Sequence, residues 1–207
     1  MSNCNLCSNF GLRFQRQYQP QEFIEGDPGS RVWIVGLNPA EDPAWVDVRQ
    51  QADLLTYFDD PVKIHPYFKH FRVVSDRLFD LLGQKGGVAH TDLVKCSSYS
   101  WPPENANGAD RAQIIANCVG YLKKQIETHC PEVIVCNGSE VSAEIRRLLP
   151  PPNGTPANVT NYRHALTADK CLTVILSGFI GRIDNYAKRR LGVEIESLFP
   201  AALSAEP

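Results

Sequence analysis

Four short apolar runs, each bounded by turn residues, alternate along the chain with segments of helical periodicity. The runs are RVWIVG (31–36), GVAHTDLV (87–94), PEVIVCNG (131–138) and CLTVILSG (171–178). Their weak alternation is typical of strands that are buried on both faces. Apolar residues recur every three or four positions in 73–82, 114–126 and 141–149, where Pro150 ends the last pattern. This order predicts an α/β protein, a three-layer α/β/α sandwich around a mostly parallel four-stranded sheet.

The remaining segments add no second domain. The stretch PPPNGTPANVTN (150–161) has the composition of a loop, and FPAALSAEP (199–207) that of a loosely held C-terminal tail. We therefore expect a single domain over residues 1–198. In such sheets, ligands bind beyond the carboxyl ends of the strands. Those ends carry Gly36-Leu37-Asn38-Pro39, Lys95-Cys96-Ser97, Asn137-Gly138-Ser139 and Ser177-Gly178, which predicts a binding site at that edge.

Composition and charge restrict the classes of partner. The chain has 207 residues, 43% of them hydrophobic, which is enough for one sizeable core. A formal net charge of −2 does not by itself indicate a nucleic-acid partner, so any DNA binding would depend on a local basic cluster. The N-terminal sequence has no signal-peptide pattern, and no apolar stretch is long enough for a membrane span. We therefore expect a cytoplasmic protein.

The cysteines suggest a metal centre. There are seven, an odd number in a chain that needs no disulfide framework. Cys4 and Cys7 form a Cys-x-x-Cys, in which two thiolates can bind one metal centre. Cys96, after a predicted strand, and Cys118, on the next predicted helix, would complete four ligands suited to zinc or a [4Fe–4S] cluster. On spacing alone, Cys96 and Cys118 are equally well explained as small buried hydrophobic residues.

Six motifs follow one another in a fixed order. They are CNLC (4–7), VGLNPAED (35–42), HPYFKHFRVVSDRLFDLL (65–82), DLVKCSSYSWPP (92–103), ANCVGYLKKQI (116–126) and PEVIVCNG (131–138). Together they resemble the iron–sulfur branch, family 4, of the uracil-DNA glycosylase superfamily. The resemblance implies a monofunctional hydrolase that removes uracil or another damaged base from DNA and so begins base excision repair. It also implies that Cys4, Cys7, Cys96 and Cys118 bind a structural [4Fe–4S] cluster, with zinc as the alternative.

The resemblance assigns roles near the first strand. A glycosylase extrudes a base, holds its edge, and stabilises a cationic sugar and a departing base anion while water attacks. Gly36, Leu37 and Asn38 belong to the motif that would contact the substrate, and Asn38 would orient water because an amide is not a strong base. Asp42 would supply a carboxylate to that water or favour a helix N-terminus. Tyr67 would stack on the extruded base, or be a half-buried core aromatic.

Asp92 departs from the family pattern, which has asparagine at this position. The amide of asparagine can accept from N3–H of uracil and donate to a carbonyl, whereas an ionised carboxylate only accepts. Four interpretations are open. Asp92 is protonated in a dry pocket, it reads a different base edge, it acts as a general base, or it pairs with an arginine outside the chemistry.

The segment after the last predicted strand lacks the histidine motif with which relatives stabilise the leaving base. The hydroxyl of Ser177, the backbone amides that follow it and the charge of Arg182 are the candidates for that task. His164, in the loop before the strand, is a further candidate. The sequence therefore does not specify which base is excised.

Two further features would contact DNA. Phe179 would enter the space left by the extruded nucleotide, or pack beneath its loop. Lys188 and Arg189, in the basic run 188–190, would contact phosphates or form a solvated helix face. We expect DNA with a damaged base as the partner of a monomeric protein. The departures at Asp92 and in the last motif leave an alternative function, a catalytically altered iron–sulfur module that binds damaged or single-stranded DNA.

Overall fold

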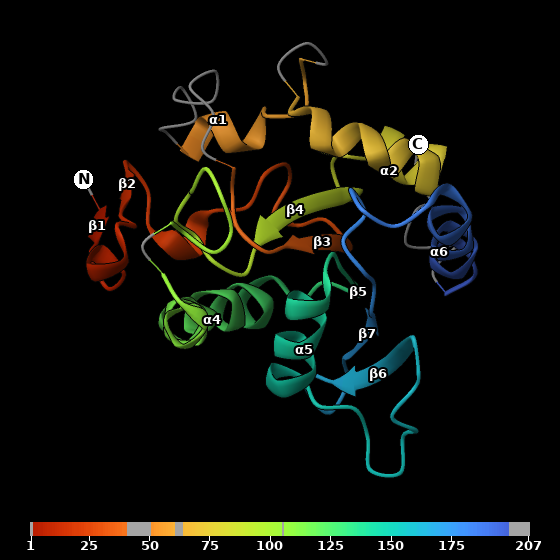
Figure 1. Cartoon of the computed structure of the whole chain (residues 1–207). Coiled ribbons are helices and arrows are strands. Elements are labelled where there is room, and N and C mark those ends of the chain that lie inside the picture. Colours follow the sequence, from red (N-terminus) through yellow and green to blue (C-terminus); the bar gives the residue numbers. More distant parts are fainter. Residues whose placement is uncertain (1, 41–50, 61–63, 105, 199–207) are drawn as a thin grey trace.

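The centre of the molecule is a five-stranded sheet in the order β4-β3-β5-β7-β6. The computed structural model describes residues 2–40, 51–60, 64–104 and 106–198 (Figure 1). The strands are β3 Val32–Gly36, β4 Val88–Asp92, β5 Val133–Cys136, β6 Asn161–Ala165 and β7 Cys171–Ile175. The four predicted strands are confirmed and pair in parallel. The fifth strand, β6, is antiparallel to β7 at the edge, and it was missed because Tyr162 alone among its residues is buried.

Helices cover both faces of this sheet, which confirms the three-layer prediction. They are α1 Gln51–Leu55, α2 Lys69–Val74, α3 Asp76–Asp80, α4 Gly108–His129, α5 Ser139–Leu148 and α6 Asn185–Leu198. Because side chains alternate along a strand, Trp33 and Val35 of β3 pack with α4 and α5 in one core cluster. Val32 and Ile34 pack with α2, α3 and α6 in the other. Figure 1 accordingly shows α2 above the sheet and α4 and α5 below it.

One predicted helix is divided in two. The apolar repeat continues through 73–82, but Ser75 has extended backbone angles, φ −159° and ψ 125°, and separates α2 from α3. Its hydroxyl accepts from Leu78 N and thereby caps α3. Near this break, α2 and α6 approach so closely that a Cβ atom on Gly192 would overlap the carbonyl oxygen of Val74. Glycine at this position therefore lets α6 pack directly against the end of α2.

The N-terminal segment forms a small two-stranded ribbon beside the main sheet. It consists of β1 Ser2–Cys4 and β2 Phe14–Arg16, which pair in antiparallel fashion, and between them lies the 3-10 helix η1 Ser8–Phe10. Two further 3-10 helices, η2 Pro20–Glu22 and η4 Pro66–Phe68, precede β3 and α2. No helix in the described part of the chain has the length and apolar character needed to cross a membrane. The predicted tail, 199–207, lies outside the described residues.

Candidate active site

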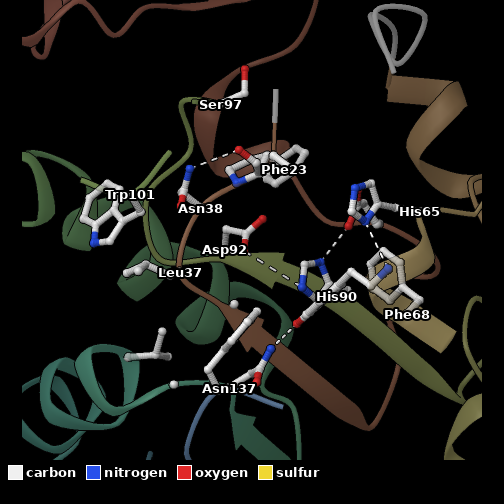
Figure 2. Close-up of a pocket in the computed structure, with 18 of the residues that line it drawn as sticks. Phe23, Leu37, Asn38, His65, Phe68, His90, Asp92, Ser97, Trp101 and Asn137 are labelled. Atoms are coloured by element: carbon white, nitrogen blue, oxygen red, sulfur yellow. Dashed lines mark hydrogen bonds and ion pairs between the residues drawn. The ribbon is translucent and has the colours of Figure 1, made fainter. Parts of the chain in front are cut away.

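A cavity of about 760 Å³ opens at the carboxyl ends of β3, β4 and β5, the edge at which a binding site is predicted. Gly36, Leu37 and Asn38 line it after β3, and Asp92 lines it from the end of β4. Asn137 contributes from the end of β5. Figure 2 shows Asp92, Asn38 and Asn137 around this space. The parallel register therefore brings together side chains that are far apart in the sequence.

Gly36 lies directly beside Asp92 in the sheet, because the two residues pair in the register of β3 and β4. A Cβ atom at Gly36 would overlap the Asp92 carboxylate and lie 3.0 Å from Nε2 of His90. A side chain at this position would displace both polar groups. Gly36 thus contributes to the site by leaving room for Asp92 and His90.

A buried row of acid, imidazole and acid forms the floor of the cavity. Nδ1 of His90 lies 2.6 Å from Oε2 of Glu25, and Nε2 lies 3.9 Å from Oδ1 of Asp92. Relative exposures are 9% for Glu25, 4% for His90 and 3% for Asp92. Figure 2 shows the Asp92 carboxylate and the His90 ring facing each other. Among the described residues, the ion-pair partner of Asp92 is thus a histidine and not the arginine of the predicted alternative.

Burial and neighbouring charges shift the pKa values of Asp92 and His90. Burial raises the pKa of Asp92 to about 6, although the nearby His90 and Lys95 lower it. Burial lowers the pKa of His90, but Asp92 and the hydrogen bond to Glu25 outweigh it, so the pKa is raised above its ordinary value. At neutral pH, Asp92 is therefore mostly ionised, and the groups around His90 favour its doubly protonated form.

Aromatic rings form one wall of the cavity. Tyr67 of η4 stacks with Phe179 at a centroid distance of 6.1 Å and an interplanar angle of 8°. The amide of Asn137 donates to the Tyr67 hydroxyl, and its Oδ1 accepts from Ile180 N at 2.7 Å. Phe179 is 42% exposed, whereas its neighbour Ile180 is 1% exposed. Phe179 is therefore placed where it can meet a nucleotide, and Ile180 packs below it.

Asn38 is held in one orientation beside the cavity. Its Nδ2 donates to Ser98 Oγ at 2.8 Å and to the carbonyl oxygen of Pro39 at 3.0 Å. Both amide hydrogens are thereby engaged, which leaves Oδ1 as the atom that can accept from a bound water. Asp42, the other candidate after this strand, lies outside the described residues.

Comparison with known protein families gives an identity to this arrangement. The model of the uracil DNA glycosylase superfamily matches residues 23–175. The chain belongs to the uracil DNA glycosylase superfamily. No individual curated protein matches the chain. The matched range includes Glu25, His90 and Asp92 but neither the Cys-x-x-Cys segment nor Phe179, and it does not distinguish the iron–sulfur branch. Membership supports a hydrolase of the DNA glycosylase type in general.

The candidates for the missing histidine of this superfamily differ in position. Arg182 lines the cavity and is exposed at its rim. Ser177 is not among the lining residues, and its hydroxyl donates to the carbonyl oxygen of Gly178 at 2.8 Å. His164 lies in the edge strand β6, where Nδ1 donates to the carbonyl oxygen of Pro150 at 2.9 Å. Neither Ser177 nor His164 lines the cavity, so the structure gives these two assignments no support and they stay predictions.

The basic run on α6 does not form one DNA-contacting surface. Lys188 is 6% exposed and lies on the buried face of α6 with Leu191 and Ile195. Arg189 is exposed, but it does not line the cavity. The predicted phosphate contact of Lys188 is therefore wrong, since a residue that is 6% exposed offers almost no surface to DNA. For Arg189, an outer contact stays a prediction.

Sequence reasoning missed His90 and Glu25. A signal for His90 was present, because residues two apart on a strand share a face, and His90 therefore points to the same side as Asp92. No comparable signal marks Glu25. It lies 65 residues earlier in the chain and reaches His90 because the backbones of the two residues pair, at 2.8 and 2.9 Å.

The four predicted metal ligands converge next to α4. Interaction with the neighbouring Cys118 thiol lowers the pKa of Cys7 to about 6, although burial opposes it. Burial and the nearby Cys7 and Cys4 raise the pKa of Cys96 to about 12. Asn117 of α4 donates to Leu6 O at 3.0 Å and so ties the N-terminal segment to the helix. None of these cysteines forms a disulfide.

The geometry of the thiols is looser than that of a closed metal site. Within the described ranges, no group of three or more His, Cys, Asp or Glu side chains has an arrangement that could hold a metal ion. The electrostatic coupling nevertheless links Cys96 to both Cys7 and Cys4, and Cys118 to Cys96. The four thiols therefore lie in one region beside α4. Four soft sulfur donors fit zinc or an iron–sulfur cluster.

Proposed function

We propose that this protein is a monomeric, monofunctional DNA glycosylase that hydrolyses the N-glycosidic bond of uracil, and of damaged bases with a similar edge, in DNA. The proposal rests on the superfamily match together with one observation. Buried polar groups, His90 and Asp92 on β4 together with Glu25, line the floor of a cavity with an aromatic wall, as an extruded base requires. Base excision repair would begin with this step.

Different residues around the cavity would bind the base, the attacking water and the DNA backbone. Tyr67 and Phe179 stack against the extruded base, a contact worth about 1–3 kcal/mol. The ionised carboxylate of Asp92 accepts from an N–H of the base edge. Oδ1 of Asn38 accepts from the attacking water and holds it near C1′ of the sugar. Arg182, at the rim, pairs with a phosphate of the DNA backbone.

The reaction needs no strong base in this scheme. The C1′–N bond breaks and its electron pair leaves with the base, so that the sugar becomes cationic. Water then gives its hydroxyl to C1′, and its released proton balances the charge of the departing base. Asp92 carries a negative charge at the floor of the same cavity, which favours the cationic sugar.

We further propose that Cys4, Cys7, Cys96 and Cys118 bind a structural [4Fe–4S] cluster, with zinc as the alternative. The convergence of four free thiols supports this assignment. When bound, the cluster would connect the N-terminal segment to α4 and to the loop after β4. It would take no part in the chemical step. Iron, sulfide and zinc analysis of protein purified without air separates the two centres.

The function is tested with oligonucleotides that each carry one lesion. Purified protein is incubated with single- and double-stranded DNA containing uracil or another deaminated base, and the abasic products are cleaved with alkali. We expect excision of uracil, and strongly reduced excision by Asn38→Ala. If no lesion is excised from either form of DNA, the glycosylase assignment is wrong. Salt-dependent DNA binding without product would instead support the non-catalytic DNA-binding module.

A further inference from the structure

One ring nitrogen of His90 faces Asp92 at ion-pair distance but has no hydrogen-bond partner among the described residues. Nε2 forms no hydrogen bond with the described residues, although the side chain is only 5% exposed. A buried polar atom in this state costs about 1–3 kcal/mol, so a folded protein rarely retains one without use. Nε2 lies at the floor of the cavity and 3.9 Å from Asp92 Oδ1. Nε2 can therefore form a hydrogen bond with a molecule bound in the cavity.

The other ring nitrogen is fixed by Glu25. The backbones of Glu25 and His90 pair in antiparallel fashion, and the Glu25 carboxylate lies 2.6 Å from Nδ1. Because an ionised carboxylate can only accept, Nδ1 carries a proton in this pair. Any second proton on the ring must therefore be on Nε2, where it points toward Asp92 and the cavity.

The surroundings favour that second proton. Burial lowers the pKa of His90, whereas the charges of Asp92 and Glu25 raise it further than burial and Lys95 lower it. From η4, the ring meets the edges of Tyr67 and Phe68, at centroid distances of 5.9 and 4.9 Å. Burial and Asp92 raise the pKa of Tyr67 well above its usual range, so this phenol stays neutral and adds no charge.

We propose that Glu25 holds His90 as an imidazolium whose Nε2–H donates to a carbonyl oxygen of the extruded base, beside the Asp92 carboxylate that accepts the neighbouring N–H. This inference rests on the proposed glycosylase function and specifies its substrate class. An acceptor beside a cationic donor recognises an N–H next to a carbonyl, which uracil has. Cytosine presents an unprotonated N3 to Asp92, which is repulsive, and where His90 faces C4 it also presents an amino group in place of the carbonyl.

The protonated His90, held by Glu25, would also stabilise the transition state of base release. As the C1′–N bond breaks, negative charge collects on the carbonyl oxygens of the base, so a charged donor binds the transition state more tightly than the substrate. His90 is then a catalytic residue in contact with the leaving base. Glu25 acts through His90 and is a positioning residue. This charge stabilisation is the task for which Ser177 and His164, which do not line the cavity, were the sequence candidates.

Glu25→Gln separates charge from geometry, because glutamine keeps a side-chain oxygen that accepts from Nδ1. We expect its kcat on uracil to fall about 10- to 100-fold at neutral pH with little change in KM. A protonated His90 is lost as pH rises, so the alkaline limb of the rate profile should move to lower pH in the variant. His90→Gln should lose at least as much activity. Glu132→Gln, the same charge change at an exposed site outside the cavity, should behave as wild type.

Two further measurements distinguish the possible failures. The imidazole resonances of His90 should titrate at lower pH in Glu25→Gln than in wild type, a result that does not depend on activity. The loss of rate should be smaller for 5-fluorouracil, whose anion needs less stabilisation. If wild type excises uracil but Glu25→Gln keeps its kcat and its alkaline limb, this inference is overturned and the glycosylase function stands. If wild type excises nothing, both are overturned.

Discussion

Asp92→Asn removes a buried charge from the cavity floor while keeping the shape of the side chain. Burial raises the pKa of Asp92 from its ordinary 3.8 to about 6. One pKa unit corresponds to about 1.4 kcal/mol, so holding Asp92 ionised at neutral pH costs the folded state roughly 3 kcal/mol. Asparagine carries no such cost. We therefore expect the variant to be more stable than wild type at neutral pH, by at most about 3 kcal/mol.

The stability gained in Asp92→Asn should depend on pH, and the direction of this dependence follows from the raised pKa of Asp92. Between pH 3.8 and about 6, the unfolded chain has released the Asp92 proton while the folded protein still holds it. The contribution of Asp92 to stability therefore falls as pH rises through this window, and it is constant above and below it. The advantage of Asp92→Asn should accordingly be large at neutral pH and disappear in acid below that window.

Urea unfolding followed by circular dichroism, at neutral pH and in acid, measures this difference. Asp59→Asn, at an exposed position, is the control for a change of net charge. The rate of uracil excision by wild type should fall about tenfold per pH unit below 6, and the variant should lack this limb. An advantage that is equal at both pH values, or a variant less stable than wild type at neutral pH, would refute the account of Asp92 as a buried, costly carboxylate.

Three other predictions concern separate parts of the site. Asn38→Ala should lower kcat about 100-fold with unchanged thermal stability, because the attacking water loses its acceptor; a wild-type single-turnover rate would count against that role. Phe179→Ala should weaken DNA binding, measured by fluorescence anisotropy, by about 1–3 kcal/mol. Ile180→Ala, at a buried position, should chiefly lower the melting temperature. Equal DNA binding by both variants would contradict the role of Phe179 in contacting DNA. Cys118→Ser should lose bound iron and sulfide while Cys130→Ser retains them, and iron-free wild type would exclude the cluster.

The sheet was predictable because its strands are buried on both faces. β3, β4 and β5 are fully buried, so each leaves an apolar run in the sequence. β6 has one buried residue, Tyr162, and therefore leaves no apolar run in the sequence. The break at Ser75 was invisible to periodicity because the apolar repeat continues on both sides of it.

The candidate site was predictable only in part, for reasons that differ from residue to residue. Asp92, Asn38 and Tyr67 were found through motif positions at strand ends. Lys188 was misassigned because a run of charges was considered without its helix face, although it lies three and seven residues before the buried Leu191 and Ile195 of α6. Contacts such as that of Glu25 with His90 depend on tertiary pairing, which no local pattern encodes.

A buried polar network connects the thiols to the cavity. Lys95 immediately precedes Cys96, and its ammonium group donates to Gln125 Oε1 at 2.7 Å and to the backbone carbonyl of Asp92. Gln125 in turn donates to the carbonyl oxygen of Phe23 at 2.9 Å, two residues before Glu25. Since Gln125 and Cys118 lie seven residues apart on one face of α4, whatever fixes Cys118 also fixes the segments that carry both carboxylates. The proposed cluster would therefore act on catalysis mechanically, by keeping Glu25 and Asp92 on opposite sides of His90.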